Sequence, residues 1–369
     1  MGMFDRSGTG SIKWARAGEG RIALGLADMD LPGPPEIGAA LAERARHPAY
    51  GYTVCDPGGR ELVARWYRER HRVVVDPDWV LLLPFSARTA LRLLLAAVGP
   101  RGPVLSPTPD WGGFRQLCEV AGLAYRAVEL ARDGGGYRLP VAEFAGAGLV
   151  LLSNPHNPSG RVWQAAELRA LAEQAAGRGG LLVSDEVHSD LVHPDLGLRH
   201  PVAVAVAGEA ARHTVTLNSV GKTFNTSGIP SCFALVPDPG LRERLLTLMG
   251  GYGLWEGGLV PQLVQRAALE HGGPWLDALL QRLAGHRELA LAALGPAVAS
   301  RPEASYLLWL DATALGLPAE GARELLLTER DVELSAGTDF GPAWGSHLRL
   351  NYALPVERLR AALTRLTPC

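Results

Sequence analysis

Lysine is almost absent from this sequence. Of the 36 Lys and Arg residues, only Lys13 and Lys222 are lysines, and the other 34 are arginines. An arginine side chain stays protonated, whereas a lysine amine can lose its proton and condense with an aldehyde. Lys222 lies in a Ser/Gly-flanked turn, residues 219–225, that follows an apolar–polar run. This pattern indicates either chemistry that needs a primary amine or a surface lysine left by compositional bias.

Cysteines and long apolar segments are also scarce. The four cysteines, Cys55, Cys118, Cys232 and Cys369, include no CxxC pair. This spacing argues against a structural zinc site and a disulfide framework, and we expect no metal. Apolar runs such as residues 80–83 are far too short to span a bilayer. No apolar stretch follows a basic N-terminal segment. We therefore expect a protein of the reducing cytoplasm without a membrane anchor.

An excess of charge of either sign is missing as well. The formal net charge is −2, with 36 basic and 38 acidic residues. Such a balance creates no field that would attract nucleic acid or an anionic membrane. The partners expected for this chain are therefore small molecules or another copy of itself.

The length and composition are those of an ordinary globular protein. The 369 residues, 47% of them hydrophobic and 20% charged, are enough for two domains, or for one large domain with a smaller lobe. Residues 1–21 are rich in Gly and polar residues and show little periodicity, which predicts an extended arm rather than a packed element.

From Val80 onward, short apolar strands alternate with helical segments, as they do in βαβ units. Continuous apolar runs that end in polar residues are typical of parallel strands covered on both faces. Ligands bind outside the carboxyl ends of such strands, where Ser153, Asp185 and the Lys222 turn would meet. The predicted strands are 80–83, 104–107, 124–130, 148–153 and 180–185, and the predicted helices are 89–98 and 114–121.

After residue 236 the pattern changes to helices, with a long segment at 260–294 that is broken near 272–274. The last part of the chain combines apolar segments with helices, which predicts a small α+β lobe. The segments are 305–311 and 347–351, and the helices are 320–328 and 355–366.

Three segments resemble successive signatures of class I and II pyridoxal 5′-phosphate (PLP) enzymes. They are residues 154–163 (NPHNPSGRVW), 184–191 (SDEVHSDL) and 219–225 (SVGKTFN). Within that superfamily the chain resembles the cystathionine β-lyase, or C–S β-lyase, branch, because residues 9–14, 27–30, 51–53 and 349–351 match it in the right order. Several ordered motifs are far more specific than one alone.

The resemblance covers nearly the whole chain and implies an α/β, fold-type I PLP-dependent transferase. Residues 1–34 would form an N-terminal arm and part of the small domain. Residues 35–270 would form the large PLP-binding domain with a mostly parallel sheet, and residues 271–369 the small α+β domain.

The resemblance also implies roles around the cofactor ring. Lys222 would bind the cofactor aldehyde and then act as general base, and Asp185 would lie beside the pyridine nitrogen. Asn157 and His188 would reach the ring hydroxyl; many relatives carry Tyr in place of His188. From the residues alone, a strand-end Asp such as Asp185 can instead cap a helix.

For the cofactor phosphate, the resemblance implies the helix start at Ser86, Ala87 and Arg88, together with the Ser219 hydroxyl. The family usually has Gly where Ser86 stands. Tyr52 resembles the Tyr that reaches the phosphate from the other subunit, so the site would be complete only in a homodimer. A Tyr in a Gly-Tyr-Thr turn can instead simply pack at a subunit surface.

For the substrate, the resemblance implies contacts from Arg349, Trp111, Asn157 and Tyr52. Arg349 matches the arginine that binds the α-carboxylate, although such an Arg can also be an ion-pair partner. Trp111 would stack on the ring where this branch more often has Tyr, and it offers an N–H in place of a hydroxyl. We expect the substrate's side chain to contact segments 27–31, 252–257 and 338–344.

The function implied is that of a C–S β-lyase, which cleaves an S-substituted L-cysteine to a thiol, pyruvate and ammonia. Two alternatives stay open: an aminotransferase, or a decarboxylation-dependent oxidative deaminase acting on a cysteine conjugate, as in lincosamide-antibiotic pathways. The Ala/Gly/Leu/Arg-rich composition suits a high-GC source, where such antibiotic biosynthesis is frequent. A PLP-fold regulator without turnover is disfavoured, because no basic DNA-binding segment is present.

Overall fold

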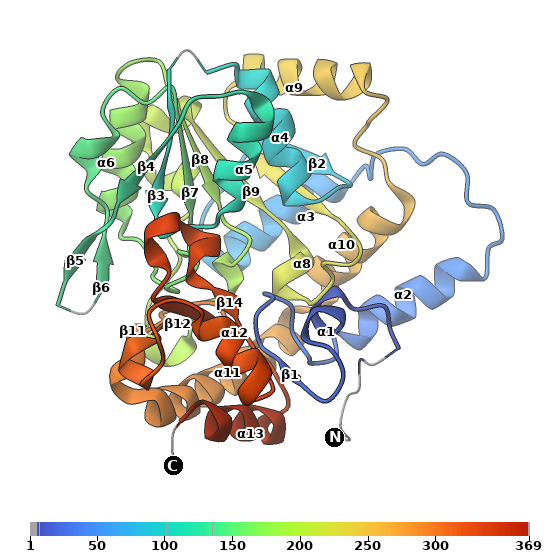
Figure 1. Ribbon diagram of the computed structural model, residues 1–369. Coiled ribbons are helices and arrows are strands. Elements are labelled where there is room, and N and C mark those ends of the chain that lie inside the picture. The colour runs from blue at the N-terminus through green and yellow to red at the C-terminus, as the bar shows by residue number, and fades with distance from the viewer. Residues whose placement is uncertain (1–5, 7, 101, 135, 368–369) are drawn as a thin grey trace.

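The computed structural model describes residues 6, 8–100, 102–134 and 136–367. A seven-stranded sheet forms the centre of the larger part of the molecule (Figure 1), in the order β2-β10-β9-β8-β7-β3-β4. Its strands are β2 (Val80–Leu83), β3 (Val104–Thr108), β4 (Tyr125–Glu129), β7 (Leu149–Ser153), β8 (Leu181–Asp185), β9 (Thr214–Asn218) and β10 (Cys232–Leu235).

The sheet is mostly parallel, as predicted. Only β10 runs antiparallel to its neighbours, β2 and β9. Strands β3, β4, β7, β8 and β9 pair in parallel. Each strand predicted between residues 80 and 185 is present with bounds that differ by at most one residue, while β10 was not predicted as a separate strand. The carboxyl ends of β7, β8 and β9 therefore lie side by side.

Both faces of this sheet are covered. Along β7, Leu149 and Leu151 belong to one core cluster and Val150 and Leu152 to another. Helices α4 (Ala87–Val98), α5 (Gly113–Ala121) and α9 (Pro239–Gly251) contribute to the first cluster, and α6 (Ala165–Ala176) to the second. Successive residues of a strand point to opposite faces, so burial on both sides explains the unbroken apolar runs.

The C-terminal part forms a smaller α+β lobe below the large sheet (Figure 1). Its four-stranded sheet has the order β11-β12-β15-β14, with β11 (Val298–Ser300), β12 (Leu307–Asp311), β14 (Ser335–Ala336) and β15 (His347–Asn351). Helices α10 (Leu259–His271) and α11 (Gly273–Leu294) precede it, with the predicted break at Gly272, and α12 (Ala322–Glu329) and α13 (Val356–Leu366) complete it. Among the described residues, none of these helices is long and apolar enough to cross a membrane.

The N-terminal segment joins this lobe. Strand β1 (Ile22–Ala23) pairs in parallel with β13 (Val332–Glu333). This pairing supports placing part of the N-terminus in the small domain, and the domain bounds 1–34, 35–270 and 271–369 stay a prediction.

The prediction of an extended arm over residues 1–21 is wrong for the part of this segment that the structure describes. Residues Ile12–Ala17 form a short helix, α1, in which Lys13 and Ala17 are completely buried. The local sequence has no apolar stripe at helical spacing that would have predicted this helix. Instead, α1 is held by a polar contact between Lys13 and Asp30, a residue of a distant segment. Residues 1–5 and Cys369 lie outside the described residues.

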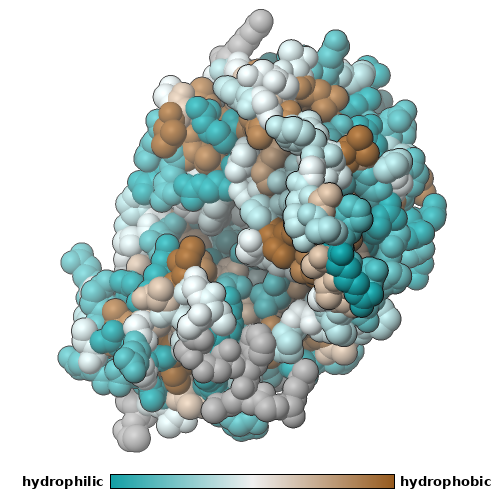
Figure 2. All heavy atoms as spheres, turned by 90° about the vertical axis from the view of Figure 1, so that its right-hand side faces the viewer, coloured by the Kyte–Doolittle hydropathy of each residue, from teal (hydrophilic) through white to brown (hydrophobic). Residues whose placement is uncertain are grey.

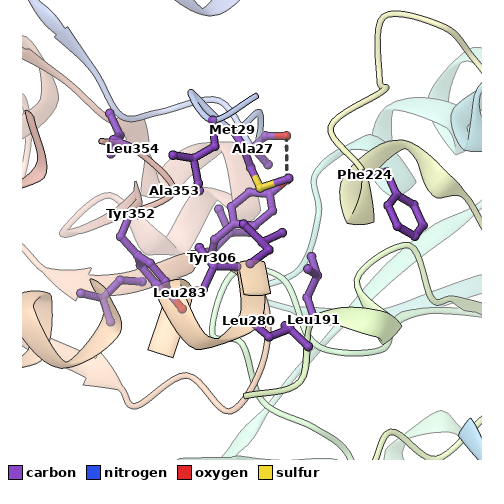
Figure 3. Packing of buried hydrophobic residues seen from close by; sticks show 14 of the residues in the cluster. Ala27, Met29, Leu191, Phe224, Leu280, Leu283, Tyr306, Tyr352, Ala353 and Leu354 are labelled. Carbon is purple, nitrogen blue, oxygen red and sulfur yellow. Dashed lines mark hydrogen bonds between the residues drawn. The ribbon is translucent and has the colours of Figure 1, made fainter. Parts of the chain in front are cut away.

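Residues 25–31, here called the strap, cross between the two parts of the molecule and lead to α2 (Pro35–Ala45). Figure 3 shows Met29 of the strap near Ala353 of the lobe, and the Tyr306 hydroxyl donates a hydrogen bond to the Ala27 carbonyl at 3.3 Å. Ala27 and Met29 belong to the largest core cluster, together with residues of α11 and β12. The strap is therefore anchored by apolar packing on the lobe side.

Candidate active site

A pocket of about 270 Å³ opens where the carboxyl ends of the central strands meet the strap and the small lobe. It contains ten of the eleven predicted site residues; Tyr52 is the exception. The predicted residues that line it are Ser86, Ala87, Arg88, Trp111, Asn157, Asp185, His188, Ser219, Lys222 and Arg349.

Lys222 lies in a single helical turn, α8 (Val220–Thr223), directly after β9. Ser219 begins this turn: its hydroxyl accepts a hydrogen bond from the Gly221 N–H at 3.0 Å and donates to the Ser231 carbonyl at 2.6 Å. The Lys222 amine donates to the carbonyl oxygen of Ala27 at 2.6 Å. Burial lowers the pKa of Lys222 to about 8, against the opposing charge of Asp28. A larger share of this amine is therefore unprotonated near neutral pH than for an exposed lysine.

Asp185 ends β8 on the floor of the pocket. Its carboxylate accepts a long hydrogen bond, 3.4 Å, from the Val187 N–H. Burial raises the pKa of Asp185 to about 7, although the positive charge of Lys222 acts in the opposite direction. A buried carboxylate is stable in its charged form only beside a cation. Asp185 is thus suited to hold a protonated ring nitrogen.

Arg349, from β15, is buried at the lobe side of the pocket. Its guanidinium donates to Asn157 Oδ1 at 3.0 Å and to the Gly25 carbonyl at 2.7 Å, and it lies over the Phe340 ring. Burial lowers the pKa of Arg349 to about 10, so the group stays charged at neutral pH. No carboxylate of the described residues forms an ion pair with Arg349, and the group can therefore bind an incoming carboxylate.

His188 follows β8 and is buried against the small lobe. Its Nδ1 lies 3.0 Å from the Ser305 hydroxyl, and its ring packs edge-on against Tyr306. Burial lowers the pKa of His188 to about 3, with smaller contributions from the charges of Lys222 and Arg349. The imidazole is therefore neutral and can either donate or accept a hydrogen bond at the pocket.

The start of α4 forms another wall of the pocket. Ser86 is its N-cap, and the Ser86 hydroxyl accepts a hydrogen bond from the Thr89 N–H at 3.2 Å. This contact caps the first turn of α4. The first N–H groups of a helix have no acceptor within the helix, so those of Ala87 and Arg88 are suited to bind a phosphate.

Trp111 lies opposite this helix start, with the Arg88 guanidinium 5.7 Å from its ring centroid. The preceding residue, Asp110, is buried and was not predicted as part of the site. Its carboxylate accepts hydrogen bonds from the Trp111 N–H, the Ser153 N–H and the Ser153 hydroxyl. Burial raises the pKa of Asp110 to about 7. Asp110 thereby ties the Trp111 loop to the end of β7.

Sequence reasoning missed a further group of pocket residues: Leu26, Val187, Gly221, Thr226, Ser227, Ile229, Pro230 and Ser231. Five of them follow Lys222 by four to nine positions, so their nearness to the lysine was the signal that could have found them. Of the three segments expected to contact the substrate side chain, 27–31 contributes Ala27. Segments 252–257 and 338–344 contribute none of the described lining residues.

Tyr52 lies outside the pocket of its own chain. It is 97% exposed and packs edge-on against Trp255. The loop that carries it, residues 46–58 between α2 and α3 (Gly59–Trp66), extends away from the body of the molecule on the right of Figure 1. Figure 2 views that side and shows hydrophobic residues in several groups. Tyr50 and Val54 in the same loop, and Tyr252 in the segment after α9 that carries Trp255, are also large exposed hydrophobic side chains.

The fold and the pocket define a PLP-type α/β enzyme of fold type I, and comparison with known proteins agrees. Residues 21–366 match the model of the family "Aminotransferase class I and II". The chain belongs to that family.

The relatives place it in the expected branch. The chain is 32% identical to cystathionine β-lyase PatB of Bacillus subtilis, over 98% of this chain and 97% of that protein. It is 28% identical to a cystathionine β-lyase of Corynebacterium glutamicum, over 96% and 95%. For the fold, the structure of a PLP-bound protein described as an aminotransferase, from Clostridium difficile 630, superposes with a TM-score of 0.92 at 26% identity, over 99% of this chain and 97% of that chain. The resemblance to the C–S lyase branch is thus confirmed.

Proposed function

We propose that this protein is a PLP-dependent C–S β-lyase that cleaves an S-substituted L-cysteine to a thiol, pyruvate and ammonia. The observation that carries the proposal is one pocket that joins a lysine amine of lowered pKa, Lys222, to a buried guanidinium, Arg349, which forms no ion pair with the described residues. The first group can remove a proton and the second can bind an α-carboxylate. The cystathionine β-lyases among the relatives support the same reaction.

The pocket fits PLP. The Asp185 carboxylate suits the ring nitrogen, and the first N–H groups of α4 with the Ser219 hydroxyl suit the phosphate. Asn157 and His188 would reach the ring hydroxyl and Trp111 the ring face, as the family resemblance implies. When bound, the cofactor supplies an electron sink for the bond that breaks at the substrate Cα.

The reaction then depends on where Arg349 and Lys222 hold the substrate. Arg349 binds the α-carboxylate, supported from behind by Asn157, and this contact orients the bonds at Cα. Lys222 takes the Cα proton onto Nζ. The bond from Cβ to sulfur breaks next and the thiolate leaves, and water then releases ammonia and pyruvate. His188, which stays neutral, donates or accepts a hydrogen bond without adding a charge beside Lys222.

We also propose a homodimer in which Tyr52 of one subunit completes the pocket of the other, at the cofactor phosphate and the substrate. The support is the 97% exposure of Tyr52 on an extended loop and the large hydrophobic side chains exposed around it. Large aromatic side chains at a surface of this kind are typical of interfaces. A cytoplasmic location stays a prediction.

The products formed from L-cystathionine and from a cysteine with a bulky S-substituent test the proposed reaction. Pyruvate with an equal amount of thiol supports the β-lyase. An α-keto acid that retains the sulfur substituent would instead show the aminotransferase, and CO2 with an aldehyde the decarboxylating deaminase. Trp111 is the residue that keeps these alternatives open, because it lacks the hydroxyl more usual in this branch.

A further inference from the structure

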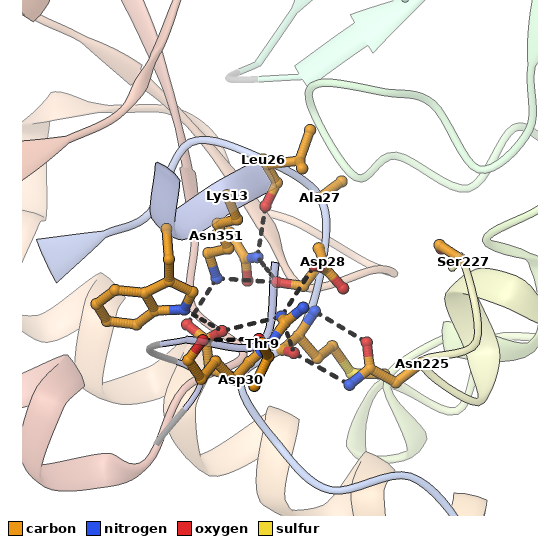
Figure 4. A network of polar contacts seen from close by, with 12 residues as sticks. Thr9, Lys13, Leu26, Ala27, Asp28, Asp30, Asn225, Ser227 and Asn351 are labelled. Atoms are coloured by element: carbon orange, nitrogen blue, oxygen red, sulfur yellow. Dashed lines mark hydrogen bonds and ion pairs between the residues drawn. The ribbon is translucent and has the colours of Figure 1, made fainter. Parts of the chain in front are cut away.

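The strap is held mainly by side chains that bind its backbone carbonyls. Every carbonyl from Gly25 to Met29 accepts at least one hydrogen bond from a side chain, and Figure 4 shows part of this network. The donors come from the N-terminal segment, the large sheet region and the small lobe. They are Arg349 and Ser335 on Gly25, Asn351 on Leu26, Lys222 and Tyr306 on Ala27, Lys13 and Asn351 on Asp28, and Arg6 and Asn225 on Met29.

Both lysines of the chain bind this strap, at consecutive residues. Lys222 donates to the Ala27 carbonyl at 2.6 Å, and Lys13 donates to the Asp28 carbonyl at 2.9 Å. Lys13 also pairs with the Asp30 carboxylate at 2.8 Å, and both side chains are completely buried. The two lysines are therefore connected through two consecutive peptide groups of the strap.

The carboxylate of Asp30 is held by contacts from three side chains, of which Lys13 is one. Asp30 accepts a further hydrogen bond from the Trp14 indole N–H at 3.0 Å and forms an ion pair with Arg6 at 3.2 Å. Burial lowers the pKa of Lys13, and the charge and hydrogen bond of Asp30 oppose that effect. A buried pair adds little net stability but fixes one arrangement of the groups it joins. An arginine here would bring a larger, planar fork in place of a compact ammonium.

We propose that Lys13 is a positioning residue for the reaction: through Asp30 and the Asp28 carbonyl it fixes the strap so that the Ala27 carbonyl holds the Lys222 amine. The proposal rests on the proposed function of Lys222 as the base. When Nζ takes the Cα proton it becomes an ammonium group, and the Ala27 carbonyl accepts a hydrogen bond from it. A displaced carbonyl would leave that charge without its acceptor in a buried pocket.

Besides the Ala27 carbonyl, four charged or titratable groups interact electrostatically with the Lys222 amine: Asp28, Asp185, Arg349 and His188. Of these, Asp28 belongs to the strap, and its carboxylate pairs with Arg6 at 2.9 Å. Movement of the strap therefore changes both the hydrogen bond from Lys222 to Ala27 and the position of the Asp28 charge, which raises the pKa of Lys222. The other three groups come from elements outside the strap.

Because the chain has two lysines, labelling with [ε-13C]lysine gives two NMR signals, and Lys13→Met leaves the one from Lys222. We expect the pKa of Lys222 in cofactor-free Lys13→Met to fall by about one unit below the wild-type value, a tenfold change in protonation. In the loaded enzyme, we expect kcat to fall about tenfold with KM changed less than about threefold. The matched control is Arg16→Met, an exposed residue of the same helix, which should change neither quantity.

Trp14→Phe keeps an aromatic ring and removes one hydrogen bond to Asp30, so it should also lower the pKa of Lys222, by a smaller amount. It serves as the test if Lys13→Met does not fold. An unchanged pKa of Lys222 in the folded variant tested would overturn the proposal, as would equal effects from Arg16→Met. The titration needs no substrate, so its outcome is independent of whether the protein proves to be a lyase.

Discussion

Arg349 and Asn157 join the two parts of the molecule at the pocket: the guanidinium of Arg349 donates to the side-chain oxygen of Asn157 at 3.0 Å. Arg349 comes from the small lobe, and Asn157 from the turn after β7 of the large sheet. One residue pair thus relates the proposed carboxylate site to the proposed cofactor site.

Arg349→Ala should lower kcat/KM for every amino-acid substrate by roughly 30- to 200-fold, because a charged contact of this kind contributes about 2–3 kcal/mol. The variant should still bind the cofactor, which the absorption spectrum measures. Arg360→Ala, at an exposed position of α13, is the control and should match the wild type. A loss below about fivefold would mean that Arg349 does not bind the carboxylate.

Trp111→Tyr should change the ratio of products more than it weakens cofactor binding. The ring stack is kept and the hydroxyl usual in this branch is restored, so elimination should gain relative to other outcomes. Quantifying pyruvate, α-keto acid and CO2 from one substrate measures the effect. If all the ratios stay unchanged, Trp111 stacks on the ring without influencing the outcome.

Asp110→Asn should raise the free energy of unfolding, relative to the wild type, more at high pH than at low pH. Burial raises the pKa of Asp110 to about 7 from an ordinary value of 3.8, so the folded protein binds the proton more tightly than the unfolded chain. The wild type therefore loses stability as pH rises through that pKa, and the asparagine variant avoids this loss. Between about pH 5 and about pH 8, the free energy of unfolding of the variant relative to wild type should rise by at least about 1.4 kcal/mol. Urea unfolding at both pH values measures it, and no rise would mean that Asp110 has an ordinary pKa.

A mixture of inactive Tyr52→Ala and Lys222→Ala subunits should recover part of the wild-type activity. In a hybrid dimer, one of the two pockets regains both an intact lysine and an intact tyrosine from the partner. Activity after subunit exchange is compared with each variant mixed with itself. If exchange is demonstrated and no activity returns, Tyr52 does not complete a neighbouring site.

Most of the large sheet was predictable, because its buried parallel strands have continuous apolar runs with polar ends. The Asn157, Asp185 and Lys222 motifs are local in sequence, and the structure brings them into one pocket. The α1 helix was not predictable, since it is held by the contact between Lys13 and Asp30, which lies seventeen positions away. Asp110 was missed for a similar reason: nothing local marks a carboxylate whose donors include Ser153, forty-three positions along the chain. Tyr52 lies outside the pocket of its own chain, and its proposed role involves a second subunit, which a pattern within one chain does not locate.

Borohydride reduction of the holoenzyme, followed by peptide mapping, tests the central claim most directly, since Lys13 and Lys222 are the only two lysines. We predict that the reduced cofactor is found on the peptide with Lys222, that the peptide with Lys13 carries none, and that Lys222→Ala neither retains the cofactor covalently nor turns over substrate at the wild-type rate. Cofactor on Lys13, or a Lys222→Ala protein of undiminished activity, would contradict the account.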